Sequence, residues 1–261
     1  MTRVLPGGLI IALWLPASAW ALQPLITDDT GTQGAGGNQV ELSYNRFVER
    51  EPGTKAVTVS LPLVYTRGLT EAVDIYLGGS YVQFRPPASD STGSDAGNLV
   101  AGLKWRFFES ETGDLSLAFK PEIRFPVSSR AEDRGLGSGK LNGGAALLLT
   151  QETGFGAIHA NLAVSSQHFT LPENQMIHRS TLWRLSVAPV WDVSEKWKVV
   201  VDTGLVTNPH RVEKARMGYL ELGAIYAPGK DLDLAAGIVR DLDHEGHDVL
   251  LLTLGITWRF R

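Results

Sequence analysis

His178 and Ser180 come closest, in residue type and spacing, to a catalytic pair. A serine hydroxyl activated by a histidine base would be the nucleophile of an acyl-transfer reaction. Alternation along the chain places Ser180 on the same face as Arg184 and Ser186, which is the polar face. No asparagine lies near Asp192, where a residue that orients the histidine would stand. We therefore expect polar residues at a loop mouth here and no catalytic residue.

Two other segments begin like ion-binding or phosphate-binding loops and then depart from the pattern. Residues 241–248 start like a calcium loop, but the twelfth position is Leu252, where a bidentate glutamate is required. Residues 135–140 are rich in glycine, but Arg134 and Leu141 stand where a phosphate loop needs glycine and serine or threonine. The absence of cysteine excludes thiolate chemistry and cysteine-bound metals. We expect solvated loops, no metal and no cofactor.

The composition fits neither a low-complexity chain nor a helical membrane protein. Of the 261 residues, 43% are hydrophobic and 20% are charged, and the mean hydropathy is −0.03. The net charge of −4 provides no basic field, so nucleic acid is excluded as a partner. The 28 glycines suit a chain in which many strands are separated by turns.

Residues 1–21 have the features of a secretory signal peptide. Arg3 precedes the apolar run 9–15, and residues 19–21 read Ala-Trp-Ala, the small-residue pattern that a signal peptidase accepts. We predict cleavage after Ala21 and export of the mature chain. The alternative is a short anchoring helix, but the run is shorter than the roughly 20 apolar residues that span a bilayer.

The rest of the chain alternates between apolar and polar residues. Along 115–125 the odd positions, such as Leu117 and Phe119, are apolar, whereas Lys120 and Glu122 occupy even positions. This period of two predicts strands with different surroundings on their two faces. Twelve segments show it, namely 39–50, 55–68, 71–84, 97–108, 114–126, 140–151, 156–167, 179–192, 196–207, 217–228, 231–241 and 248–260.

The connections between these segments alternate in length. Tight turns at 68–70, 109–114, 152–154, 194–195 and 228–230 alternate with longer polar links at 85–97, 128–139, 169–178 and 209–216. Short turns at one end and long loops at the other are typical of outer-membrane barrels, whose turns lie in the periplasm. We therefore predict an all-β protein, a closed antiparallel transmembrane β-barrel of about 12 strands in the bacterial outer membrane. The sheet must close because unpaired backbone groups in hydrocarbon cost several kcal/mol each.

Aromatic residues provide a test that is independent of the alternation. They sort into two levels, as expected for girdles at the two membrane interfaces, with Tyr81, Phe125 and Trp183 toward the long loops. The predicted periplasmic girdle is Tyr65, Trp105, Phe107, Trp191, Trp197, Tyr226, Trp258 and Phe260. Outer-membrane lipids and lipopolysaccharide are the expected surroundings. The final strand, which ends in Phe260-Arg261, resembles the signal that the barrel-assembly machinery recognises, although the terminal residue of that signal is normally aromatic.

The opposite face of the same strands carries charges of both signs and faces the predicted lumen, with Glu41 and Asp74 among them. Such charges line a water-filled path or pair and fill the lumen, and a barrel of this size permits either arrangement. The candidate lumen residues are Lys104, Arg106, Lys120, Glu122, Arg124, Arg184, Lys198, Asp202, Glu221, Asp233 and Arg259. A path for hydrophobic solutes would also require apolar residues on the inward face. Those present are Tyr76, Val100, Val200, Tyr219, Ile225 and Val239.

The residues after the predicted cleavage site resemble a known family. Residues 23–34, QPLITDDTGTQG, and residues 37–42, GNQVEL, are similar to the segment that opens proteins of the MetA-pathway of phenol degradation family. The resemblance implies an exported bacterial barrel that is often labelled a transporter and is sometimes encoded beside pathways for aromatic compounds. Beyond these residues the resemblance consists of barrel patterning that many families share.

We predict that residues 22–38 form an N-terminal periplasmic segment before the barrel, which comprises 39–261. Asp28, Asp29 and Thr30, with glycines after them, could fold back as a plug near the periplasmic mouth and place two carboxylates against lumen cations. The alternative is a hydrated lead-in to the first strand, and the sequence favours neither.

These observations favour a channel for the passive uptake of small solutes, aromatic or hydrophobic ones among them. The alternative is a barrel with a closed lumen that acts through its extracellular loops by binding a partner or lipopolysaccharide. A lipid hydrolase comes third. His178 and Ser180 resemble the catalytic arrangement of the outer-membrane phospholipase A family, also a twelve-strand barrel, but Ser180 faces the predicted lumen and not the lipid.

Overall fold

The computed structural model describes residues 23–51, 54–86, 92–211, 214–242 and 248–261. The predicted signal peptide lies outside these residues. Within them, no helix is long and apolar enough to cross a membrane. Thirteen strands and two short helices make up the regular structure of this part of the chain.

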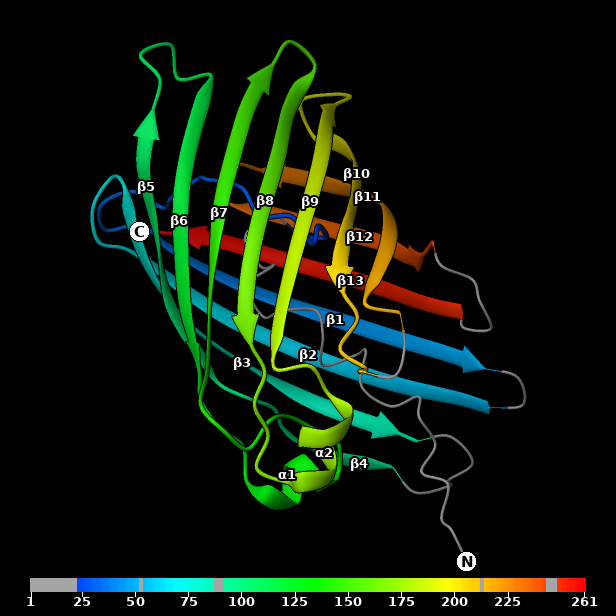
Figure 1. Cartoon of the computed structure of the whole chain (residues 1–261). Coiled ribbons are helices and arrows are strands. Elements are labelled where there is room, and N and C mark those ends of the chain that lie inside the picture. The colour runs from blue at the N-terminus through cyan, green and yellow to red at the C-terminus, as the bar shows by residue number, and fades with distance from the viewer. Residues whose placement is uncertain (1–22, 52–53, 87–91, 212–213, 243–247) are drawn as a thin grey trace, which may run out of the picture.

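Twelve of these strands are long and form a closed antiparallel barrel (Figure 1). Each pairs with the next long strand, and β1 pairs with both β2 and β13, which closes the ring. The predicted barrel is confirmed, and every predicted strand overlaps an observed one. The strands are β1 (Asn38–Glu51), β2 (Thr54–Gly68), β3 (Val73–Arg85), β5 (Val100–Glu109), β6 (Leu115–Arg124), β7 (Asn142–Thr153), β8 (Gly156–Ser166), β9 (Thr181–Asp192), β10 (Trp197–Thr207), β11 (Arg216–Gly229), β12 (Leu232–Asp241) and β13 (Asp248–Phe260).

The long connections contain three short elements that the alternation does not predict. They are β4 (Gly93–Ala96), α1 (Ser129–Asp133) and α2 (Pro172–Ile177). β4 extends the sheet beside the end of β3. Ser128 caps α1 by accepting a hydrogen bond from the Ala131 N–H at 3.2 Å. Each element has six residues or fewer, too few for a periodic pattern to reveal it.

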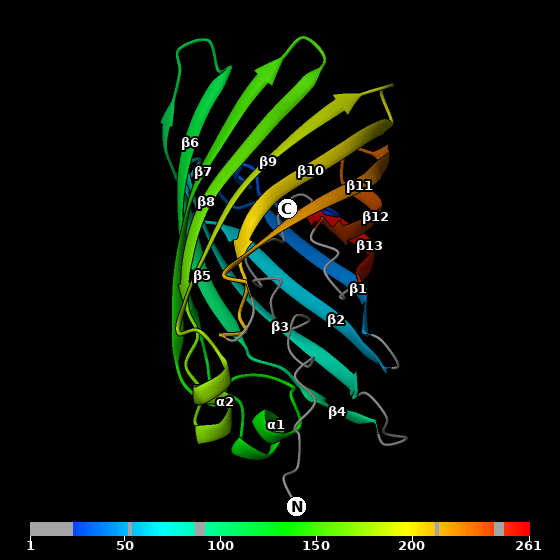
Figure 2. The same cartoon turned by 45° about the vertical axis from the view of Figure 1, so that its right-hand side comes forward.

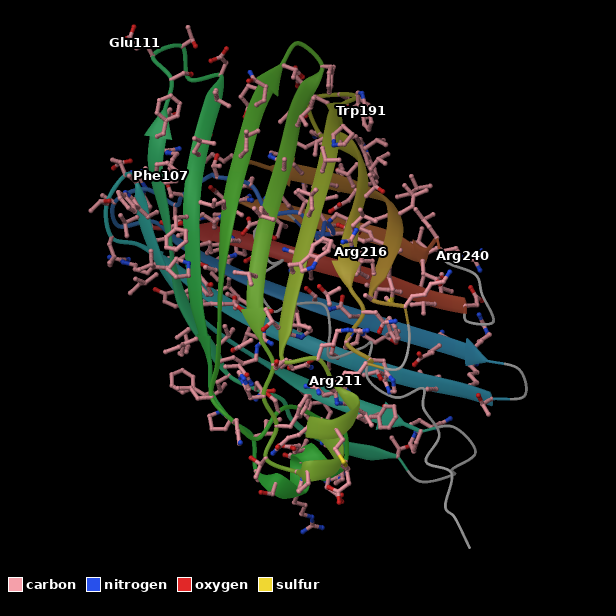
Figure 3. The ribbon with its side chains drawn as sticks, viewed as in Figure 1. Phe107, Glu111, Trp191, Arg211, Arg216 and Arg240 are labelled. Atoms are coloured by element: carbon pink, nitrogen blue, oxygen red, sulfur yellow. The ribbon has the colours of Figure 1, made fainter. Side chains whose placement is uncertain are left out.

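The barrel has two unlike ends (Figure 2). At the turn end, short turns follow β2, β5, β7, β9 and β11, and the start of β1 pairs with the end of β13. At the loop end, longer connections carry β4, α1 and α2. Figure 3 labels Glu111 at the turn end and Arg211 at the loop end. The turn end corresponds to the predicted periplasmic side.

Side chains alternate between the two faces of the wall. On β13, Leu254 is 56% exposed and the preceding Thr253 is 7% exposed. On β6, Lys120 is buried and Ile123 faces outward. Water would oppose so large an apolar outer surface, whereas hydrocarbon would not. The wall therefore has the apolar outer face and polar inner face of a membrane barrel.

Candidate functional site

Residues 23–37, called here the N-terminal segment, run through the barrel interior. Leu25, Thr27, Asp28 and Thr30 are each at most 2% exposed. The hydrogen-bond partners of the segment come from strands around the ring, from β3 to β11. In Figure 1 the segment is the dark-blue trace behind the green strands. The chain before β1 thus occupies the lumen.

Asp28 is bound by two lysines of the wall. Its Oδ1 lies 3.0 Å from Lys104 Nζ on β5, and its Oδ2 lies 2.6 Å from Lys120 Nζ on β6. Asn161 on β8 accepts from the Asp28 backbone N–H at 2.7 Å and donates to its carbonyl at 2.8 Å. Asp29 reaches Lys104 at 3.4 Å. Burial alone would raise the pKa of Asp28, but the two ammonium groups outweigh burial and hold that pKa below its usual range.

The two residues before Asp28 are bound by carboxylates of the opposite wall. Thr27 donates its backbone N–H to Asp202 Oδ2 at 2.6 Å and its hydroxyl to Asp202 Oδ1 at 2.9 Å. Ile26 donates its backbone N–H to Glu221 Oε2 at 3.3 Å. Because cations bind one side and anions bind the other, the segment bridges the lumen electrostatically.

The residues after Asp28 lead toward the turn end. The Thr30 N–H donates to Thr150 Oγ1 at 3.1 Å. The Gln33 N–H donates to Asp74 Oδ2, near the start of β3, at 3.0 Å. The segment therefore crosses from the middle of the lumen to the rim before it continues into β1.

Leu25 and Ile26 fill apolar recesses of the wall, where the inward apolar side chains suggested a path for hydrophobic solutes. Four of those six side chains pack in clusters with residues of the segment. Val200 and Ile225 cluster with Leu25, and Tyr219 and Val239 cluster with Ile26. The other two, Tyr76 and Val100, form a separate cluster with Val64. In this structure the apolar patches around Leu25 and Ile26 are therefore covered by the protein's own chain.

Glycines on three neighbouring strands make room for the start of the segment. A Cβ atom at Gly223 would lie 2.6 Å from Pro24, and one at Gly237 would lie 2.9 Å from Pro24. A Cβ atom at Gly255 would overlap the Gln23 side chain. Real side chains do not approach so closely, so the inner wall is hollowed where the segment lies against it.

The remaining lumen candidates form ion pairs or lie toward the rims of the barrel. Arg124 lies 3.1 Å from Glu122, and Lys198 pairs at the turn-end rim with Asp192, which the alternation does not assign to the lumen. Of the candidates, Lys104, Lys120, Arg184, Asp202 and Glu221 are buried, and Arg106, Glu122, Arg124, Lys198, Asp233 and Arg259 are partly exposed.

The open space in the lumen is unevenly distributed. On the loop-end side of Asp28, two cavities of about 50 and 90 Å³ adjoin at Arg124 and Gln167. At the turn end, a mouth of about 860 Å³ opens beside Arg259, which pairs with Asp233 at 2.7 Å. A cavity of roughly 150 Å³ can hold benzene. Neither inner cavity by itself is therefore large enough for an aromatic ring.

The predicted girdle aromatics lie on the outer face near the turn end, and none is buried. Figure 3 labels two of them, Phe107 and Trp191, toward this end. Trp191 stacks on Phe155, with 5.9 Å between the ring centroids. The alternation does not predict Phe155, because this residue lies in the turn between β7 and β8. Other ring pairs are Trp105 with Phe107 at 5.7 Å, Trp197 with Tyr226 at 4.8 Å and Trp258 with Phe260 at 4.5 Å. Tyr65 donates to Asn38 at 2.6 Å.

His178 and Ser180 do not form a nucleophile and base. His178 Nδ1 lies 2.8 Å from the Asn174 carbonyl oxygen, and its Nε2 has no hydrogen-bond partner among the described residues. Burial is the main cause that lowers the pKa of His178 to about 4, too low for an effective base at neutral pH. Residues 243–247 of the calcium-like loop lie outside the described residues. Within the described ranges, no cluster of three or more histidine, aspartate or glutamate residues could hold a metal.

Glu132 on α1 joins two long connections at the loop end. It is 1% exposed. Its Oε2 accepts from the N–H groups of Gly139 at 2.6 Å and Thr170 at 2.9 Å. Its Oε1 accepts from the Leu171 N–H at 2.7 Å and from Asn174 Nδ2 at 3.2 Å. We call this arrangement the loop clasp. The sequence gives no signal for it, because its partners are mostly backbone groups of a distant loop.

Comparison with known proteins agrees with this architecture. A model of the family described as "Putative MetA-pathway of phenol degradation" matches residues 22–260. No curated protein matches the sequence. The COG4313 outer membrane channel from Pseudomonas putida F1 is similar in structure, with a TM-score of 0.73 and 12% identity over 89% of this chain and 98% of that one.

Two further solved structures share the fold. The NanC porin has a TM-score of 0.58 and 7% identity, covering 83% of this chain and 98% of its own. The CymD monoaromatic hydrocarbon channel has a TM-score of 0.52 and 8% identity, covering 88% of this chain and 90% of its own. At these identities the similarity concerns the barrel fold.

Proposed function

The chain belongs to the MetA-pathway of phenol degradation family, and on this basis we propose that it is an outer-membrane channel for passive uptake of small solutes, aromatic or hydrophobic ones among them. We further propose that the N-terminal segment is a plug that closes the lumen at rest. The observation that carries the proposal is the binding of Asp28 between Lys104 and Lys120 in the middle of the lumen.

The way in which the segment is bound supports a removable plug. The barrel wall is a continuous ring of paired strands, whereas residues 23–35 of the segment are held by hydrogen bonds that involve side chains and by apolar contacts. The segment can therefore leave without breaking a strand pair. Its departure would uncover the apolar recesses around Leu25 and Ile26. The barrels of similar fold that are named as channels, one of them for monoaromatic hydrocarbons, support the same class of function here.

The decisive experiment measures single-channel conductance of refolded protein in a planar bilayer, with and without residues 22–37. We expect rare openings in the full chain and sustained conductance in the truncated chain. Folded protein is identified by its altered gel mobility before heating, because closed barrels resist detergent. Similar steps in both proteins would mean that the pore is open and the segment is no plug. Silence in both would contradict the channel.

The second candidate is a closed barrel that acts through its extracellular loops. The loop clasp favours it, because a buried carboxylate fixes two long connections in one arrangement. Lipopolysaccharide is the proposed partner in that case. Binding of lipopolysaccharide that depends on Glu132, in a protein that never conducts, would establish this candidate over the channel.

The same geometry bears on the membrane partners of the barrel and on whether it has a catalytic residue. We propose that lipids contact the aromatic girdle and that the barrel-assembly machinery recognises the last strand. We assign no catalytic residue, since His178 is bound to a backbone carbonyl. A Ser180→Ala substitution should leave lipid hydrolysis at background level, and a loss of measurable hydrolysis in this variant would contradict that assignment.

A further inference from the structure

Arg184 on β9 is a buried cation whose hydrogen-bonding capacity is not used. The residue is 5% exposed, and its Nε and Nη1 have no hydrogen-bond partner among the residues that the structure describes. A buried cation whose N–H groups make no hydrogen bond costs several kcal/mol. The carboxylate of Asp202 interacts electrostatically with Arg184, but it accepts its hydrogen bonds from Thr27 and from the Tyr219 hydroxyl, the latter at 2.8 Å. Arg184 is therefore positioned for an anion that comes from outside the chain.

The cavity beside Arg184 has the chemistry of a site for an organic anion. It is the cavity of about 50 Å³ on the loop-end side of Asp28, and its wall includes Arg184, Lys120 and Arg124. Lys120 pairs with Asp28 at 2.6 Å, and Arg124 pairs at 3.1 Å with Glu122, which also lines this cavity. Apolar side chains complete the wall, from Ala146, Ala163, Leu182 and Val206.

The size of the two inner cavities indicates how a ligand would lie. The cavity at Arg184 has room for a carboxylate group but not for an aromatic ring. The second cavity, of about 90 Å³, adjoins it at Arg124 and Gln167 and has apolar walls that include Phe47 and Phe169. The Gln167 Oε1 has no hydrogen-bond partner among the described residues, so its side chain is free of that constraint. A ligand with a carboxylate at one end and an apolar body could span both cavities once this side chain turns.

We propose that Arg184, with Lys120 on the wall of the same cavity, forms a subsite for the carboxylate of a small aromatic acid on the loop-end side of Asp28. A planar guanidinium presents a fork of N–H groups that matches the two oxygens of a carboxylate, and the lysine adds a point charge. The subsite gives the proposed channel a preference for aromatic acids over neutral hydrocarbons. It rests on the proposed function only in that the bound acid is a solute in transit.

The test is equilibrium dialysis of benzoate against the refolded full chain in detergent, with benzyl alcohol as the neutral probe of similar shape. We expect saturable binding of benzoate and much weaker binding of benzyl alcohol. Arg184→Gln should weaken benzoate binding about tenfold or more, since hydrogen bonds between charged groups are lost. Arg184→Lys keeps the charge but lacks the planar fork of N–H groups, so its affinity for benzoate should lie between those of the unaltered chain and Arg184→Gln.

The control is Arg216→Gln, an outward cation that lies 5.5 Å from the Trp183 ring and should bind benzoate as the unaltered chain does. Gel mobility before and after heating shows that each variant is folded. Equal binding of the two probes, absence of saturable benzoate binding, or unchanged affinity in a folded Arg184→Gln variant would overturn the subsite. Dialysis requires no conductance, so this result is independent of whether the channel conducts.

Discussion

Two buried carboxylates bind different parts of this barrel, and their partners differ in kind. Asp28 in the N-terminal segment is bound by two lysine side chains of the wall. Glu132 in the loop clasp is bound by three backbone N–H groups and one side-chain amide. The first attachment is an ion pair inside the lumen. The second consists of hydrogen bonds from neutral groups at its loop end.

The difference indicates which of the two attachments is suited to release. The loop clasp joins two connections whose ends are fixed in neighbouring strands of the wall. The N-terminal segment is continuous with the wall only through β1, so loss of the Asp28 contacts weakens the attachment of a stretch of chain that joins the wall at one end only. We therefore expect changes at Asp28 to alter conductance and changes at Glu132 to alter only the loops.

The largest expected effect comes from Asp28→Asn. Removing one partner of a buried ion pair costs about 3–5 kcal/mol, because the other charges remain buried. The ratio of open to closed channel should rise roughly a hundredfold or more, measured as open probability in a planar bilayer. Asp29→Asn is the matched control, since Asp29 is less buried and pairs with one of the two lysines, Lys104, at 3.4 Å. An Asp28→Asn channel as closed as the unaltered chain would refute the role of this ion pair.

A smaller effect is expected from Gly237→Ala, which tests the hollow in the wall. The added Cβ would lie 2.9 Å from Pro24 and 2.7 Å from a Glu221 carboxylate oxygen, so the segment must shift. Overpacking of this kind costs about 1–3 kcal/mol and should raise the open probability accordingly. Gly143→Ala is the control, because its nearest neighbour atom would be 3.6 Å away. Equal behaviour of the two variants would mean that the segment does not fit the wall closely.

Glu132→Gln should separate the two regions. The substitution weakens the loop clasp by about 1–3 kcal/mol, as expected for hydrogen bonds to a charged group. Hydrogen exchange at the amides of Thr170 and Leu171 should become faster, while the conductance stays as it was. If instead Glu132→Gln opens the channel, the loop clasp controls the lumen and the contrast with Asp28 is lost.

The smallest effect is expected from moderate acid. The pKa of Asp28 is lowered in the folded protein, so its contribution is present above the ordinary aspartate value of about 3.9 and is lost as pH falls through the lower folded value. Between pH 7 and pH 5 the Asp28 contacts should persist, and open probability should rise only below about pH 4. An increase that begins near pH 6 and persists in Asp28→Asn would assign the response to another group.

The barrel could be predicted from the sequence because its main pattern is local. Alternation along each strand places Lys104 and Lys120 on the inner face without knowledge of any partner. The interaction between these lysines and Asp28 could not be derived in the same way, since it joins residues 76 and 92 positions apart. The sequence therefore supported a plug and a hydrated lead-in equally.

Other features could not be derived from the sequence, for identifiable reasons. Val200 and Ile225 are inward and apolar, but alternation cannot distinguish a wall that lines a path from one that packs against Leu25. Glu132 binds mostly backbone N–H groups, which every residue type except proline provides, so no sequence motif marks it. Phe155 lies in a turn, where the period of two ends.

The junction between the N-terminal segment and β1 has a kinetic consequence. Gly36 and Gly37 are joined to Gly68 at the start of the first turn by two backbone hydrogen bonds, of 3.0 and 2.9 Å. A released segment would remain tethered at this point, and a short tether maintains an effective concentration in the millimolar range. Its return is a unimolecular step, so the rate at which an open channel closes should be independent of protein concentration. The single-channel current should therefore show brief openings, and their mean duration measures how quickly Leu25 and Asp28 rebind in the lumen.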